Sequence, residues 1–249
     1  MIGVSIAAWA QDPSAAPPPT PARPIAAREG VLSFEPKHPV PVFPLPGVVL
    51  FPGARLPVHV FELRYRTMVR EALSSERVIA MALLLPGWER DYHGSPEFHP
   101  LGCLARIDEV VWLPDDCYDL RLLGLERARL GRTVREFPYR AVRVQVLPQE
   151  PFSEDDALVQ LERRALVEAG ARLARAAEEG PPPDPPVDEG LPFEPLVNTM
   201  CMGLAAEPAV KLALLGMDSV IERARRAREL MEEEVLRAGR TGAGGGEHN

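Results

Sequence analysis

The spacing of apolar residues divides the chain into a β-rich part and a helical part. Within residues 40–148, Leu56, Val58 and Val60 alternate with polar or proline positions, which is the two-residue period of a strand. Residues 78–85 form an unbroken apolar run, as expected for a strand buried on both faces. After Glu62 the period lengthens to that of a helix. The apolar residues of this helix are Tyr65, Met68, Val69, Ala72 and Leu73.

Further strands are predicted on both sides of the turn Pro114-Asp115-Asp116, at residues 104–113 and 118–123, and then at 128–134 and 142–146. Residues 86–100 are predicted to form a loop. Prolines in residues 40–51 argue against a fully paired central strand there. About six strands and one helix in roughly 110 residues favour a small β-barrel over an open α/β sheet.

From Ser153 onward the pattern is helical. Ser153-Glu154-Asp155-Asp156 resembles a capping box, and short helices are predicted at 193–204 and 208–215. A last helix is expected from Asp218, as its cap, to about Leu236. In the helix that follows Ser153, the apolar residues at helical spacing are Leu158, Leu161, Ala165, Ala169 and Leu173. In the last helix, the expected buried residues are Val220, Ile221, Ala224, Ala227 and Met231. The predicted fold class is therefore α+β, a small barrel followed by an α-helical bundle.

Four segments follow from these patterns: a Pro/Ala-rich leader (residues 1–39), the barrel (40–148), a helical subdomain with a Pro-rich loop at 179–192 (149–237), and a Gly-rich tail (238–249). The leader and the tail have too little apolar surface to offset the entropy of ordering, so we expect both to be disordered.

Charge and composition narrow the possible partners. The net charge is -8 at pH 7, which disfavours nucleic acid and anionic membranes as partners of the chain as a whole. No apolar run approaches the roughly 20 residues that span a bilayer. Cys103, Cys117 and Cys201 are far apart, without the spacing of a zinc site or a disulfide framework. We therefore expect the three thiols to be buried and the protein to be cytoplasmic. We expect it to bind no metal and no cofactor.

The chain lacks the residues that known catalytic motifs require. Its only lysines are Lys37 and Lys211, and neither lies in the Gly-Lys-Ser/Thr sequence of a phosphate-binding loop. Neither neighbours a serine that it could activate as a nucleophile. We therefore expect no catalytic residues and no enzymatic activity.

Several short sequences, in this order, resemble the N-terminal substrate-binding domain of ATP-dependent Lon proteases. They are PVFPL (residues 41–45), VVLFPG (48–53), FELRY (61–65), LGCLARI (101–107), GLERAR (124–129) and PYRA (138–141). The resemblance is to stand-alone versions of that domain. It implies a PUA-like barrel followed by helices, as also occurs in the eukaryotic substrate receptor cereblon.

Two surfaces are candidates for binding. Residues 86–100 contain Trp88, Tyr92 and Phe98, aromatic residues without a periodic reason to be there. They would serve as peptide-binding anchors or, alternatively, fold back and plug the barrel. The second surface is a basic face with Arg127, Arg129 and Arg143 at its centre, drawn from a local excess of arginines that either meets RNA or pairs with acidic helices.

The function that these observations favour is a non-catalytic protein-binding or peptide-binding module, possessing no protease machinery of its own. The resemblance implies partners that are unfolded or degron-bearing polypeptides, a protease as a further candidate partner, and a role as an adaptor or regulator of proteolysis. The alternative is an RNA-binding PUA-like domain, with a hydrolase as the third choice.

Overall fold

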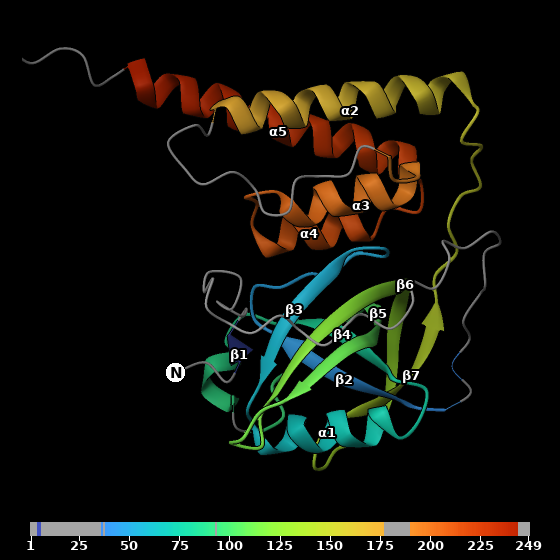
Figure 1. Ribbon diagram of the computed structural model, residues 1–249, viewed down its shortest axis with the longest axis vertical. Coiled ribbons are helices and arrows are strands. Elements are labelled where there is room, and N and C mark those ends of the chain that lie inside the picture. The colour runs from blue at the N-terminus through green and yellow to red at the C-terminus, as the bar shows by residue number, and fades with distance from the viewer. Residues whose placement is uncertain (1–3, 6–35, 37, 93, 177–189, 244–249) are drawn as a thin grey trace, which may run out of the picture.

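The computed structural model describes residues 4–5, 36, 38–92, 94–176 and 190–243 (Figure 1). Most of the expected leader, the greater part of the Pro-rich loop and the end of the tail lie outside the described residues. Val4 and Ser5 are an exception to the expected disorder of the leader, because they form a short strand.

One sheet contains every strand of the described chain. Its strands are β1 (Val4–Ser5), β2 (Val40–Leu45), β3 (Arg55–Val60), β4 (Val78–Leu84), β5 (Phe98–Trp112), β6 (Tyr118–Arg135) and β7 (Ala141–Val146). Their order is β1-β3-β6-β5-β4-β2-β7, and β6 also pairs with β7. This additional pairing closes β2, β4, β5, β6 and β7 into a ring, with α1 (Leu63–Leu73) beneath it (Figure 1). The predicted small barrel with one helix is confirmed.

The longest strand replaces two predicted ones. β6 runs through 18 residues, pairing with β3 in its first part and with β7 in its second. Gly124, near the change of partners, lies so close to Phe51 that a Cβ atom would come within 2.0 Å of the Phe51 carbonyl oxygen. A glycine that looked like the end of a strand is instead a point of close backbone approach within it.

Two further elements differ from the sequence prediction. Phe98 begins β5 rather than lying in a loop, and Trp88–Asp91 form a short 3-10 helix, η2.

β2 does lie inside the sheet, but it pairs with β4 only over Val42 to Leu45 and with β7 only at Val40 and Pro41. The interpretation that this proline-rich segment is not fully paired therefore holds.

The helical part consists of α2 (Ala157–Ala176), α3 (Phe193–Gly203), α4 (Pro208–Leu215) and α5 (Val220–Ala243). α2 and α5 lie side by side, and α3 and α4 separate them from the barrel (Figure 1). The capping residues differ from the prediction. Asp156 Oδ1 accepts a hydrogen bond from Leu158 N (2.8 Å), and Ser219 Oγ accepts one from Glu222 N (3.5 Å). Asp218 is not a cap because its carboxylate pairs with Arg127.

The buried face of α2 is rotated from the predicted one. Leu158 and Leu161 are exposed, whereas Val159, Glu162, Leu166 and Ala169 are buried. The cause is a carboxylate on the inner face: Glu162 Oε1 accepts a hydrogen bond from Arg225 Nε of α5 at 2.7 Å. An apolar pattern alone cannot predict a face that includes an ion pair.

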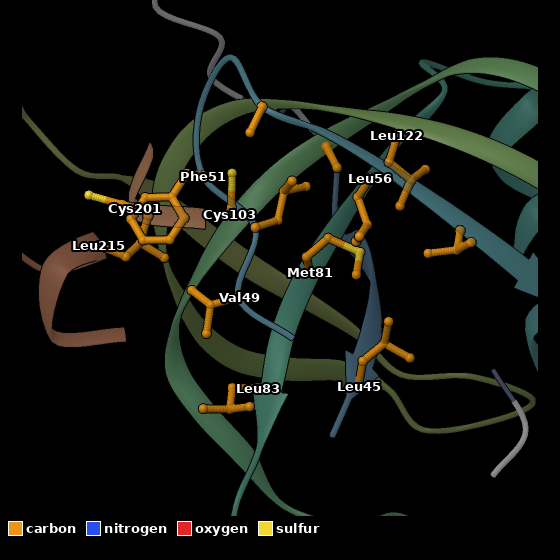
Figure 2. Packing of buried hydrophobic residues seen from close by; sticks show 14 of the residues in the cluster. Leu45, Val49, Phe51, Leu56, Met81, Leu83, Cys103, Leu122, Cys201 and Leu215 are labelled. Carbon is orange, nitrogen blue, oxygen red and sulfur yellow. The ribbon is translucent and has the colours of Figure 1, made fainter. Parts of the chain in front are cut away.

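Neighbouring residues of the central strands alternate between two hydrophobic clusters. Val78, Ala80 and Ala82 belong to the smaller cluster, and the residues between them belong to the larger one. The larger cluster continues into the helices: Cys201 of α3 and Leu215 of α4 gather near Phe51 and Cys103 of the barrel (Figure 2). The barrel and the bundle therefore share one core.

Candidate functional site

Arg127, predicted on an exposed basic face, is instead 2% exposed. Its Nη1 donates to the carbonyl oxygens of Leu215 (3.2 Å) and Met217 (2.9 Å), and Nη2 donates to Asp218 Oδ1 (2.9 Å) and to Pro148 O. The physical reason is its place on β6, under the connection from α4 to α5, where main-chain acceptors need a donor. Arg127 thus joins the barrel to the helices.

A second buried arginine completes this polar junction. Arg223 Nε donates to Leu214 O (3.0 Å), its Nη1 to Asn198 Oδ1 (2.6 Å), and Asn198 Nδ2 donates in turn to Pro52 O (3.0 Å). Burial lowers the pKa of Arg223, and the nearby charge of Arg127 lowers that pKa further. Every acceptor of Arg223 is a carbonyl oxygen of the fold, so the cluster has a structural role.

The loop before β5 is attached to the first turn of α1. Tyr92 Oη donates to Glu62 Oε1 at 2.5 Å, and Arg64 donates to the carbonyl oxygens of Tyr92 (2.8 Å) and Gly94 (2.9 Å). The rings of Trp88 and Tyr92 meet edge to face, with centroids 5.4 Å apart. Two of the three candidate anchors therefore contact each other and are held by α1.

The third candidate anchor, Phe98, contacts a different residue. The guanidinium carbon of Arg140 lies 4.3 Å from the centroid of its ring, and Arg140 Nη2 also donates to Pro96 O. A small pocket of about 60 Å³ lies nearby, lined in part by Arg64, Gly94 and Arg140. All three aromatic residues are half-buried.

The remaining arginines of the predicted basic face differ in their contacts. Arg135 pairs with Glu71 of α1 (2.9 Å), and Arg121 pairs with Glu109 of β5 (2.9 Å). Arg129 and Arg143, on β6 and β7, are exposed and form no ion pair among the described residues, and the same holds for Arg132. The basic face is thus smaller than predicted.

An apolar surface that the sequence interpretation missed lies where β5 ends and α1 begins. Its members, here called the apolar corner, are Leu63, Val110 and Trp112, with Leu63 66% and Trp112 71% exposed. Val111 is also exposed, but it projects from the opposite face of β5. Asp116 connects the two elements: Oδ2 accepts from Arg66 Nη1 of α1 (2.9 Å), and Oδ1 accepts from Trp112 Nε1 (3.3 Å). Figure 1 places the β5–β6 turn, the start of α1 and η2 at one corner of the barrel.

One sequence signal could have indicated the apolar corner. Residues 110–113 are apolar without interruption, directly before the turn Pro114-Asp115. A strand that extends to the tip of a hairpin, beyond its neighbours in the sheet, cannot be buried on both faces. An unbroken apolar run at such a tip therefore indicates an exposed apolar patch.

No catalytic arrangement is formed by the titratable groups that the structure describes. Lys211 Nζ donates to the carbonyl oxygen of Met202 (2.7 Å), and burial lowers its pKa. Burial also raises the pKa of the Cys201 thiol to about 12, which makes it a poor nucleophile at neutral pH. Among the described residues, no three His, Cys, Asp or Glu side chains are grouped as metal ligands. No helix in the described ranges is both long enough and apolar enough to cross a bilayer.

The chain is similar to Lon proteases over part of their length. It is 30% identical over 146 residues to Lon protease 2 of Myxococcus xanthus, covering 56% of this chain and 18% of the relative. It is 26% identical over 216 residues to the Lon protease of Nitratidesulfovibrio vulgaris, covering 84% of this chain and 26% of the relative. The matched region is therefore about a quarter or less of these proteases.

Two solved structures share the fold. The N-terminal domain of the Mycobacterium avium complex Lon protease superposes with a TM-score of 0.57 at 21% identity, covering 79% of this chain and 99% of that one. A Lon N-terminal domain protein from Xanthomonas campestris gives a TM-score of 0.53 at 24% identity, covering 76% and 96%. The family model of the substrate-binding domain of ATP-dependent protease La (Lon) matches residues 39–233. The chain therefore belongs to the Lon substrate-binding domain family.

Proposed function

We propose that this chain binds unfolded or degron-bearing polypeptides without catalysing a reaction on them, and that it does so at the apolar corner. The observation that carries the proposal is the exposure of Leu63 and Trp112 on rigid elements of a domain from a substrate-binding family. Large exposed apolar side chains grouped at one place are typical of protein interaction sites. In a cytoplasmic setting such a module would act as an adaptor or regulator that presents its client to a protease.

The three candidate aromatic residues have a supporting role in this proposal. Tyr92 holds the first turn of α1, which includes Leu63, through Glu62 and Arg64, and Trp88 packs against the ring of Tyr92. Because these rings are half-buried, they supply less contact area to a client than Trp112 does. Phe98 would fix the far side of the same loop through Arg140.

Polypeptide binding is tested with the full chain and a fluorescently labelled, reduced and carboxymethylated α-lactalbumin, which cannot fold. Replacing Leu63 and Trp112 together by serine should weaken its binding more than about tenfold, because truncating one aromatic hot spot costs roughly 2 kcal/mol or more. The matched control is Leu161→Ser, which removes an exposed leucine from α2. If the double variant binds as tightly as the control, the apolar corner is not the site.

RNA binding is the second candidate, supported by the exposed Arg129, Arg132 and Arg143. Affinity for RNA would fall steeply with added salt, whereas apolar capture of a polypeptide would change little. Measuring both ligands over one series of salt concentrations therefore distinguishes the two functions.

A further inference from the structure

The outer edge of the sheet at β3 is only partly occupied. On one side β3 pairs with β6 through its whole length, from Arg55 opposite Leu123 to Val60 opposite Tyr118. On the other side β1 covers only the last two residues, with Val4 opposite Val60 and Ser5 opposite His59. No strand in the described part of the chain borders residues 55–58 on that side. Unpaired amide and carbonyl groups on such an edge are where an extended chain adds to a sheet.

The edge belongs to the same sheet as Trp112 of the apolar corner, three strand spacings away across β6 and β3. Trp112 is in register with Tyr118, Tyr118 with Val60, and Val60 with Val4, so one row of residues crosses four strands from Trp112 to β1. Residues in register project from the same face of a sheet. A strand in the position of β1 would therefore present every second side chain on the face that carries Trp112.

The adjacent row of paired residues projects from the opposite face of the sheet and fixes the alignment of β3 with its neighbours. Val111 is in register with Asp119, Asp119 with His59, and His59 with Ser5. His59 Nδ1 and Asp119 Oδ1 are 2.7 Å apart, which holds β3 and β6 in register where β1 adds. The acceptor edge is thus a rigid one.

The composition of β3 suits reversible pairing. Pro57 has no amide proton, so the edge lacks one donor and a long, permanent ladder is disfavoured. Leu56, Val58 and Val60 point into the core, so an added strand would not need to displace their side chains. Main-chain pairing also does not depend on the sequence of the added strand, which suits clients of many sequences.

We propose that the outer edge of β3 is a strand-addition site for extended polypeptides, and that Val4–Ser5 of the chain's own N-terminal segment occupies its end and competes with them. The inference rests on the proposed function and adds how a client is held. A client strand displaces β1 and lies along residues 55–60, with alternate side chains on the face of the sheet that carries Trp112.

A reversible disulfide bond that fixes β1 to β3 tests this proposal in the full chain. Ser5→Cys with His59→Cys places two cysteines on directly opposed antiparallel residues, whose usual Cα separation of about 4.5–5.5 Å permits a disulfide. The three native cysteines are buried and should remain reduced. Binding of carboxymethylated α-lactalbumin should be at least about tenfold weaker in the oxidised form than after reduction, equivalent to losing a few net hydrogen bonds.

Two further variants complete the test. His59→Cys alone should bind equally with and without oxidant, which controls for the loss of the His59–Asp119 contact. Ser5→Pro should bind about threefold more tightly than the wild type, because proline weakens the competing β1 strand. Equal binding by the oxidised and reduced double variant would overturn strand addition while leaving polypeptide binding intact. Absence of binding by every form, wild type included, would overturn both proposals.

Discussion

At the scale of single residues, Arg127, which the sequence suggested as part of a ligand-binding surface, is buried and has a structural role. Arg127 and Arg223 are buried at the α4–α5 connection, where their guanidinium groups donate to the main-chain carbonyl oxygens of Leu214, Leu215 and Met217. Met217 O accepts from both arginines and Leu214 O also accepts from Met217 N, so the loss of Arg127 would be felt mainly at Leu215 O. Nothing in the sequence near Arg127 indicates this, since three of its four acceptors lie about ninety residues later in the chain.

The pH dependence of stability should involve Glu71. Hydrogen bonds from Tyr139 and then Arg135 lower the pKa of this carboxyl group. Burial, and then the hydrogen bond to Glu71, raise the pKa of Tyr139 to about 12. Because the folded pKa of Glu71 is depressed, its contribution is present above the unfolded value of about 4.3 and is lost as pH falls through the folded pKa.

Glu71→Gln should therefore be less stable than the wild type at neutral pH, and the difference should disappear in acid. Urea unfolding at a series of pH values measures this difference. Glu76→Gln, on the exposed segment after α1, is the control and should show no such change. A Glu71 effect that persists unchanged below the folded pKa would mean that the amide substitution acts through packing instead of charge.

At the scale of secondary structure, the sequence predicted most elements correctly, and it was wrong where tertiary contacts override periodicity. The helix after Glu62, the apolar strand at 78–84 and the proline-separated helices α3 and α4 follow from local pattern. The length of β6 and the buried face of α2 do not, because they depend on the approach of Phe51 to Gly124 and on the Glu162–Arg225 pair. Of the candidate aromatic residues, Trp88 and Tyr92 contact each other, whereas Phe98 lies against Arg140.

The rotation of α2 gives a direct prediction. Leu166→Ala should lower the free energy of unfolding by about 2–5 kcal/mol, the usual cost of a buried leucine, whereas Leu161→Ala should change it by less than about 0.5 kcal/mol. Both substitutions remove the same atoms from the same helix, so each is the other's control. Thermal and urea unfolding provide the measurement. Equal losses of unfolding free energy in the two variants would mean that Leu161 is a core residue, as the apolar spacing alone indicated.

At the scale of the whole molecule, the boundary near residue 150 separates a β-rich part from a helical part in the sequence, but the two parts share one hydrophobic core. The larger hydrophobic cluster contains residues of the barrel, α1 and all four C-terminal helices. Arg127, Asn198 and Arg223 add hydrogen bonds across the same boundary. The apolar corner lies at the other end of the barrel, away from the helices (Figure 1), whereas β3 begins beside α3, where a Cβ atom on Gly53 would come within 3.2 Å of Pro195. A client could therefore bind at the apolar corner without opening this junction.

A chain restricted to residues 36–150 should not form a native barrel, although it contains every strand from β2 to β7. Without α3, α4 and α5, Phe51 and Cys103 lose the apolar side chains that cover them (Figure 2), and Arg127 loses three of its four acceptors. We expect weak near-ultraviolet dichroism, strong binding of an apolar dye and a broad urea transition, the behaviour of a chain without fixed packing. Residues 36–243 should instead unfold in one cooperative step, with coincident transitions by fluorescence and dichroism. A sharp transition in the shorter chain, at the same urea concentration as in the longer one, would establish the barrel as an independent domain.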